Sequence, residues 1–379
     1  MKTLRTYGQS IWLDNIRRDL ITSGELKRMI DEDGIRGVTS NPSIFEKAIS
    51  GSSDYDEALL RLRAEGKSIP EILDGLTIQD IQLAADVFKP LYEESEGGDG
   101  YISLEVSPLL AHKEAETVEA VLDLYARVDR RNVMIKVPAT AEGIRAHEQL
   151  TGMGISINMT LIFSLETYEA VAKAYINGLK RLDDSGQPMG FVRSVASVFV
   201  SRIETAADKL IAEKMEATQD PETLAALKSL TGKIAIANAK MIYQKFKSLF
   251  EAPDFLALKH RGAHVQRPLW GSTGTKNPSY SDVLYVEELI GPHTVNTAPP
   301  ATLDAFRDHG RPRFSIEEEV EDAETLLSQL QNQGIDLKGI TDTLQAAGVK
   351  AFSDSYRNLI QVLEEKQERL LDRHRMHYS

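Results

Sequence analysis

The stretch NVMIKVPAT, residues 132–140, is the most informative about the fold, because a lysine stands in the middle of an otherwise apolar run. Alternate residues of a β-strand point to opposite sides, so a strand here would carry Val133, Ile135 and Val137 on one face and Met134 and Lys136 on the other. A buried ammonium group is costly unless it is paired, neutral or used in chemistry. The stretch therefore predicts a strand and marks Lys136 as a candidate functional residue.

Seven further segments have the character of strands, and most are separated by helical patterns. They are SIWLDN (10–15), GVTSN (37–41), YISLEV (101–106), SINMTLIF (156–163), SVASVFV (194–200), RPLWGS (267–272) and TVNTAP (294–299). About eight strands alternating with helices predict parallel βα units, and eight such units predict a closed (β/α)8 barrel, the TIM barrel. An open doubly wound sheet is the alternative. Its nucleotide-binding form is disfavoured, because no G-x-G-x-x-G follows the first strand.

Two stretches read as helical additions to this barrel. Residues from about 221 to 263 are largely helical without a strand, and residues from about 302 to 379 form a helical extension at the C-terminus. No linker rich in Pro, Gly or Ser separates either stretch from the rest. We therefore expect residues 1–379 to form a single domain.

Composition narrows the possible partners. The 379 residues carry a formal net charge of −13, which argues against nucleic acid as a partner but leaves room for a small phosphorylated ligand. The chain has no cysteine, which excludes thiolate metal sites and cysteine nucleophiles and fits a reducing compartment. The start lacks an apolar signal segment, and no run reaches the roughly 20 apolar residues that span a bilayer. We expect a cytoplasmic protein without a membrane partner.

Strand parity brings a set of polar side chains together. In a barrel, the apolar strand faces pack on the helices and the polar residues converge inside, near the C-terminal strand ends where barrel active sites lie. The converging residues would be Asp14, Glu105, Lys136, Asn158 and Thr160. These could instead be ordinary polar faces of half-exposed strands. The polar residues occupy corresponding alternate positions in four strands, and this agreement favours a functional site over ordinary polar faces.

A lysine with two carboxylates and an amide suits Schiff-base chemistry. An amine withdrawn from water loses its proton more readily and attacks a carbonyl carbon, and the resulting iminium permits cleavage of a neighbouring C–C bond without a metal or another cofactor. One carboxylate can transfer protons directly and the other through a water. His260 and His264 are four residues apart, but no carboxylate completes a metal motif, so no metal site is predicted.

The strand-end motifs resemble those of transaldolases, in particular the longer bacterial type. They are VTSNPSIF, ISLEVSP, MIKVPAT, INMTLIFS, SVFVSRI and WGSTGTKNPSYSD, in family order from about residue 8 to 300, with GVKAFSDSY near the C-terminus. The resemblance implies a (β/α)8 barrel and the pentose phosphate pathway. The implied reaction transfers a dihydroxyacetone unit from sedoheptulose 7-phosphate to glyceraldehyde 3-phosphate, giving erythrose 4-phosphate and fructose 6-phosphate.

The resemblance also implies roles for the residues inside the barrel. Lys136 matches the lysine that forms the Schiff base, and Asp14 matches the acid/base at the scissile bond. Glu105 and Thr160 match the pair that holds a catalytic water. The substrate contacts implied in the same way are Asn41, Asn158, Ser197 and Phe199.

The phosphate sites follow the family pattern less closely. Arg202 matches the phosphate-binding arginine, although a solvated surface charge is the commoner fate of such a residue. Many family members carry Ser-Phe-Arg or Ser-Phe-Lys at a second phosphate site, whereas this chain has the longer GSTGTKNP. We assign Ser272 and Lys276 there, with Arg267 as the alternative.

Two other functions remain open from the sequence. A related Schiff-base aldolase would release free dihydroxyacetone, as fructose 6-phosphate aldolases do. The extra helices favour the transferase, because the short aldolases lack them. A barrel that binds sugar phosphates without turnover is disfavoured, since Lys136, Asp14 and Glu105 are all present. The sequence does not distinguish a monomer from a homodimer.

Overall fold

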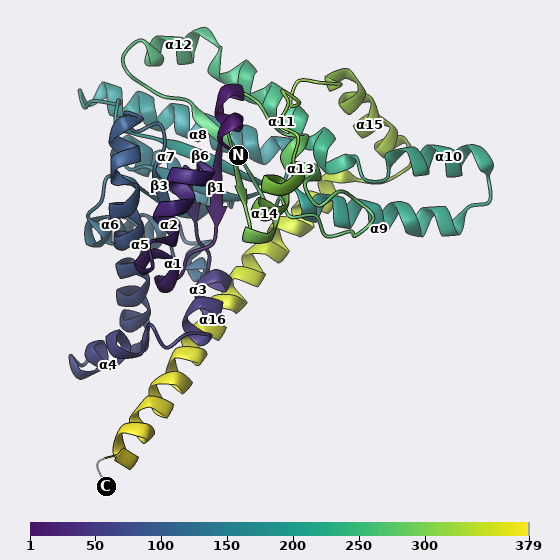
Figure 1. Ribbon diagram of the computed structural model, residues 1–379. Helices are drawn as coiled ribbons and strands as arrows, with labels where there is room; N and C mark the ends of the chain where they lie inside the picture. Colours follow the sequence, from purple (N-terminus) through teal and green to yellow (C-terminus); the bar gives the residue numbers. More distant parts are fainter. Residues whose placement is uncertain (378–379) are drawn as a thin grey trace.

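The computed structural model describes residues 1–377, with side chains described through residue 372. Eight parallel strands form a closed barrel in the order β1-β2-β3-β4-β5-β6-β7-β8 (Figure 1). They are β1 (Gln9–Asp14), β2 (Gly37–Thr39), β3 (Tyr101–Glu105), β4 (Val133–Pro138), β5 (Ile157–Ile162), β6 (Ser194–Phe199), β7 (Gln266–Gly271) and β8 (Thr294–Ala298). The predicted (β/α)8 barrel is confirmed, and the open-sheet alternative is wrong.

Helices surround this barrel. The first half of the chain contributes η1 (Lys2–Tyr7), α1 (Arg18–Thr22), α2 (Glu25–Arg28), η2 (Met29–Asp33), α3 (Pro42–Ser50), α4 (Asp56–Ala64), α5 (Ile69–Glu94), η3 (Pro108–Leu110), α6 (Glu114–Val128), α7 (Ala141–Gly152) and α8 (Leu165–Asp184). The second half contributes α9 (Ser201–Ala217), α10 (Pro221–Leu230), α11 (Ile234–Phe250), α12 (Pro253–Lys259), α13 (Leu284–Glu287), α14 (Pro300–His309), α15 (Val320–Asn332) and α16 (Leu337–His377).

Apolar side chains fill two separate regions. The larger lies between the strands and the helices, where the outward residues Val133, Ile135 and Val137 are fully buried. A smaller cluster fills the inside of the barrel, and it consists of Trp12, Tyr101, Met134, Val195, Leu269 and Val295. Gly37 allows this packing, because a Cβ there would lie 2.6 Å from the Trp12 ring. Side chains therefore fill the inside of the barrel below the C-terminal strand ends, where barrel enzymes have their active sites.

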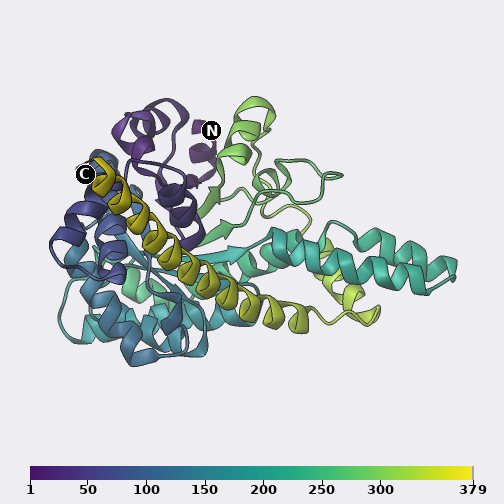
Figure 2. The ribbon, with the colours of Figure 1, turned by 90° about the horizontal axis from the view of Figure 1, so that it is seen from below.

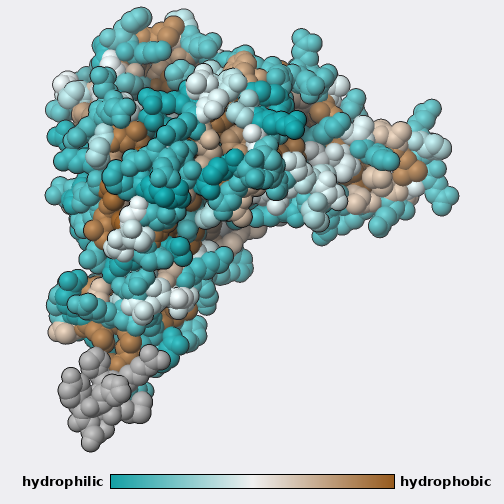
Figure 3. Space-filling model, viewed as in Figure 1, coloured by the Kyte–Doolittle hydropathy of each residue, from teal (hydrophilic) through white to brown (hydrophobic). Residues whose placement is uncertain are grey.

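The additions occupy the predicted stretches. Helices α10, α11 and α12 follow one another between β6 and β7, and α9 with α10 projects away from the barrel (Figures 1 and 2). The C-terminal extension ends in the long α16; residues 378–379 of the predicted segment lie outside the described residues. That the chain is a single domain stays a prediction. The face shown in Figure 3 is mostly hydrophilic, with apolar residues in small groups. Within residues 1–377, no helix combines the length and apolarity needed to cross a membrane.

Candidate active site

A cavity of about 610 Å³ opens at the C-terminal ends of the strands. Its lining includes nine of the residues singled out from the sequence: Asp14, Asn41, Lys136, Thr160, Ser197, Phe199, Arg202, Ser272 and Lys276. The remaining two, Glu105 and Asn158, stand next to Lys136 in the strand register, one on each side. The predicted residues thus come together at one site.

The lysine amine is held by neighbouring groups rather than left unpaired. Lys136 Nζ donates a hydrogen bond of 2.9 Å to the carbonyl oxygen of Ser40, which follows β2. It also lies 3.5 Å from Glu105 Oε2. Alternation along β4 places Lys136 on the inner face, directly above Met134 of the inner apolar cluster. The amine is therefore fixed at the floor of the cavity.

The carboxyl group of Glu105 has a pKa close to neutral pH. Burial raises its pKa to about 7, against the opposing attraction of Lys136. Neither of its oxygens has a hydrogen-bond partner among the described groups, and the same is true of the buried Thr160 Oγ1. Buried polar atoms usually have partners, so these two side chains mark a place where a small polar molecule would be stabilised.

Asp14, at the end of β1, is linked through Thr39 of β2 to Thr297 of β8, and these two strands are the neighbours of β1 in the barrel. Thr39 Oγ1 donates a 2.7 Å hydrogen bond to Asp14 Oδ1, and it lies 2.6 Å from Thr297 Oγ1. Burial raises the pKa of Asp14, whereas Lys136 and the bond from Thr39 lower it. The raised pKa makes the Asp14 carboxylate a stronger base than a free aspartate, and the hydrogen bond from Thr39 orients it.

A chain of hydrogen bonds orders the inner wall beside the lysine. Ser197 Oγ donates to Asn158 Oδ1 at 2.6 Å, and Asn158 Nδ2 donates to Ser103 Oγ at 3.1 Å. Asn158 is fully buried behind the lining, whereas Ser197 faces the cavity. Asn41 lines the cavity and also caps α3, because its Oδ1 accepts from the backbone N–H of Ile44 at 3.0 Å.

The mouth of the cavity carries four cationic side chains although the chain as a whole is acidic. They are Arg17, Lys47, Arg202 and Lys276. Arg202 lies with its guanidinium carbon 5.2 Å from the centre of the Phe199 ring, burial lowers its pKa, and none of the described carboxylates forms an ion pair with it. A partly buried guanidinium without a counterion is suited to bind an anion.

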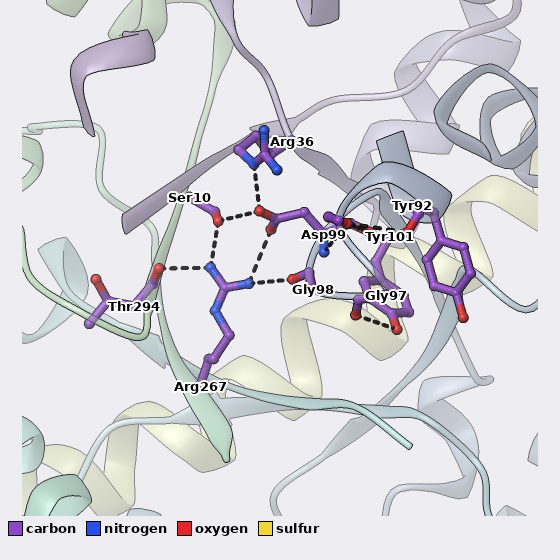
Figure 4. A network of polar contacts seen from close by, with 10 residues as sticks. Ser10, Arg36, Tyr92, Gly97, Gly98, Asp99, Tyr101, Arg267 and Thr294 are labelled. Atoms are coloured by element: carbon purple, nitrogen blue, oxygen red, sulfur yellow. Dashed lines mark hydrogen bonds and ion pairs between the residues drawn. The ribbon is translucent and has the colours of Figure 1, made fainter. Parts of the chain in front are cut away.

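Ser272 and Arg267 lie at opposite ends of β7. Ser272 follows the strand with φ of +53° and places its Oγ 2.8 Å from Ser201 Oγ at the cavity. Arg267 is the second residue of the strand and lies at the other end of the barrel, where Asp99 accepts from it at 3.1 Å (Figure 4). Arg267 as an alternative phosphate residue is therefore wrong: its position in β7 points it into the closed end.

Several lining residues were missed from the sequence. Thr39 and Thr297 lie on inner strand positions, so the parity that identified Asp14 could also have identified them. Lys47 and Phe352 come from helices α3 and α16, where no local pattern shows which face meets the cavity. In the described part of the chain, no three His, Asp or Glu side chains are close enough to hold a metal ion.

Comparison with known proteins identifies the family to which the chain belongs. A family model described as transaldolase/fructose-6-phosphate aldolase matches residues 11–363. The chain is 44% identical to a transaldolase of Trichodesmium erythraeum over 369 residues, which cover 97% of each chain. It is 46% identical to a transaldolase of Thiobacillus denitrificans over 359 residues, 95% of this chain and 98% of the relative. A transaldolase of Saccharopolyspora erythraea is 43% identical over 367 residues, 97% of each. The chain belongs to the transaldolase/fructose-6-phosphate aldolase family.

Proposed function

We propose that this protein is a transaldolase that moves a dihydroxyacetone unit from sedoheptulose 7-phosphate to glyceraldehyde 3-phosphate, giving erythrose 4-phosphate and fructose 6-phosphate. The observation that carries the proposal is a buried amine, Lys136, 3.5 Å from the carboxylate of Glu105 at the floor of a cavity that Asp14 also lines. A nucleophilic amine with two carboxylates is the set of groups that Schiff-base cleavage of a C–C bond requires.

The first half-reaction begins with the amine. Lys136 Nζ attacks the keto carbon of the donor sugar, a C–N bond forms, and the keto oxygen leaves as water after it takes up two protons. Glu105 serves these proton transfers, because a carboxyl whose pKa is about 7 both gives and accepts protons near neutral pH. The product is a protonated Schiff base that withdraws electrons from the neighbouring bond.

Asp14 then performs the cleavage. It takes the proton of the hydroxyl beyond the scissile bond, that oxygen becomes the aldehyde, and the electrons of the C–C bond move into the iminium. Its raised pKa makes the carboxylate a stronger base, and the hydrogen bond from Thr39 orients it. The acceptor aldehyde reverses these steps: a new C–C bond forms, and Asp14 returns the proton to the aldehyde oxygen.

Water finally releases the product from the lysine. We assign Glu105 and Thr160 to hold that water, since their buried oxygens have no other partner among the described residues. Asn41, Asn158 and Ser197 order the sugar hydroxyls, with Phe199 beside them. Arg202 binds the phosphate group, and Ser272 and Lys276 form the second phosphate contact.

Trapping of the covalent intermediate tests this function. The protein would be mixed with fructose 6-phosphate and reduced with borohydride, and the peptides would then be mapped by mass spectrometry. We expect a dihydroxyacetone-sized adduct on Lys136 and none on Lys240, which is equally buried but lies outside the cavity. The variant Lys136→Met should form no adduct and show no turnover. Turnover in that variant would overturn the lysine's role.

A fructose 6-phosphate aldolase is the second candidate, because the matching family model covers both activities. The two differ in whether an aldehyde or water ends the reaction. Release of free dihydroxyacetone faster than its transfer to erythrose 4-phosphate would favour the aldolase. We further propose sugar phosphates rather than nucleic acid as partners, a cytoplasmic location, and a monomer or homodimer; the acidic net charge of −13 agrees with the first of these.

A further inference from the structure

The last helix of the chain forms one side of the active-site mouth. Helix α16 packs against α3, η3 and α9, which begin just after β2, β3 and β6 respectively. Figure 2 shows it running diagonally across the barrel. Its buried stripe contains Thr341, Gly348, Phe352, Leu359 and Lys366, whose spacing of four and seven residues keeps them on one side of the helix.

Gln345 attaches this helix to the strand ends beside the catalytic lysine. Its Nε2 donates to the carbonyl oxygen of Ala139 at 2.8 Å and to that of Leu161 at 3.3 Å. Ala139 follows β4, and Leu161 directly follows Thr160 in β5. One side chain thus fixes the helix relative to both strands.

Close packing of Gly348 on Leu161 adds a second attachment. A Cβ on Gly348 would lie 2.9 Å from Leu161 Cδ2, so a larger residue at this position would require the leucine side chain to shift. Leu161 has φ of +60°, and the register of β5 with β6 shifts between Met159 and Ile162. The helix therefore packs on the irregular part of β5, next to Thr160 in the cavity lining.

These attachments place an aromatic ring over the amine. Phe352 is buried and lines the cavity, and its ring centre lies 5.9 Å from Lys136 Nζ. The ring also packs against Phe199, with 6.5 Å between ring centres and an angle of 61°. No other residue of α16 within the described side chains lines this cavity.

We infer that Phe352 determines whether the dihydroxyacetone unit is transferred to an aldehyde or lost to water. This inference rests on the proposed function. The apolar ring occupies the side of the cavity next to Lys136, where it displaces solvent from the carbon that must react with the acceptor. Exclusion of water at a reactive intermediate suppresses hydrolysis without touching the transfer step.

The two outcomes share one intermediate, the enamine left on Lys136 after cleavage. In transfer, its nucleophilic carbon forms a C–C bond with the acceptor, and the aldehyde oxygen receives a proton. In loss, the same carbon takes a proton instead, water adds to the iminium, and the C–N bond breaks to release dihydroxyacetone and the free amine. The water consumed equals the one released when the Schiff base formed. A wider opening at Phe352 favours the second route.

The test is a ratio measured in three variants. Fructose 6-phosphate is supplied with and without erythrose 4-phosphate, and free dihydroxyacetone and sedoheptulose 7-phosphate are quantified. We expect Phe352→Ala to raise the ratio of release to transfer about fivefold or more, and Phe352→Leu to raise it about twofold, because each opens the site to water in proportion to the ring area removed. Lys350→Ala, on the exposed side of α16, should leave the ratio unchanged.

The outcomes separate this inference from the proposed function. A wild-type protein with no adduct on Lys136 and no transfer would overturn both. A wild-type protein that transfers, together with Phe352 variants whose release and transfer fall in parallel, would overturn the inference alone. An equal rise in Lys350→Ala would also overturn it. Should Phe352→Ala not fold, the ratio in Phe352→Leu decides.

Discussion

Glu105 and Lys136 are directly opposite each other in the register of β3 and β4, and their side chains are only 4% and 6% exposed. Removal of two opposite charges from water is costly, and their attraction offsets only part of that cost. Burial wins for the carboxyl, whose pKa is raised to about 7. Glu105 can therefore both give and accept a proton near neutral pH.

The pH profile of turnover should report Glu105. We expect wild-type kcat to change with an apparent pKa near 7, and Glu105→Gln to lose that change together with about 10²- to 10⁴-fold of kcat, since an amide cannot transfer protons. Steady-state rates from pH 5 to 9 measure both effects. An inflection near 7 that persists in the variant would assign it to another group.

Stability should depend on pH through the same residue. The folded pKa of Glu105, about 7, exceeds the ordinary value of 4.5, so its contribution to stability is complete below pH 4.5 and is lost as the pH rises through 7. The shift corresponds to about 3 kcal/mol. Chemical unfolding at pH 5 and pH 8 should therefore show a smaller difference in Glu105→Gln than in the wild type. Equal differences would show that the shift is absent.

Asp14→Asn should separate formation of the Schiff base from C–C cleavage. The asparagine can still accept the hydrogen bond from Thr39 but cannot take the hydroxyl proton. When the variant is incubated with free dihydroxyacetone and reduced with borohydride, we expect an adduct on Lys136 at near wild-type yield. Turnover of fructose 6-phosphate should be lowered about 10²- to 10⁴-fold. Asp123→Asn, on the exposed side of α6, is the matched control. Loss of adduct and turnover together would contradict this role.

Arg202→Ala should weaken binding of phosphorylated substrates. A charge-assisted contact of this kind is worth about 1.5–3 kcal/mol, so KM should rise roughly 10- to 100-fold with little change in kcat. Arg131→Ala, an exposed residue before β4 at the opposite end of the barrel, should have no effect. An equal rise in KM for an unphosphorylated ketose would place the phosphate contact elsewhere.

Lys366 should be important for stability rather than chemistry. Its buried amine donates hydrogen bonds to the carbonyl oxygens of Ile49, at 2.9 Å, and of Ser52. It also lies 2.8 Å from the carboxylate of Asp56. These contacts attach the C-terminal half of α16 to the end of α3 and the start of α4. Lys366→Ala should lower the free energy of unfolding by about 2–4 kcal/mol, because the three groups that the buried amine holds lose their cation. Chemical denaturation measures this, with Lys350→Ala as the exposed control. A change below about 0.5 kcal/mol would contradict it.

The strands and their inner faces could be predicted from the sequence because the signal is local. Period-two alternation around Lys136 and Asn158 gives the phase directly, and barrel closure then brings the strand ends together. The family resemblance supplied Asn41 and Arg202, which lie beyond the strands and have no alternation to identify them.

Other parts of the site depend on docking between distant segments. Phe352 and Leu161 lie nearly 200 residues apart in the chain, and nothing in the helical pattern of α16 shows which face meets β5. The alternative of Arg267 fails for a different reason. The sequence predicts its strand, but Arg267 lies near the start of that strand, and the start of a barrel strand is at the closed end rather than at the site.

The closed end of the barrel limits how substrates can pass. Arg267 and Arg36 both bind Asp99, and Ser10 donates to the same carboxylate at 2.8 Å (Figure 4). The inner apolar cluster fills the barrel between this network and the active site. The two arginines hold the pKa of Asp99 below its usual range, although burial alone would raise it. The Asp99 carboxylate therefore stays ionised and keeps both arginines bound at the closed end. Substrates then enter and leave at the other end of the barrel, where α16 forms one side of the mouth. In the proposed mechanism the aldehyde cut from the donor leaves through this mouth before the acceptor binds. Initial-rate plots against donor at several acceptor concentrations should accordingly be parallel lines, the pattern of a ping-pong enzyme.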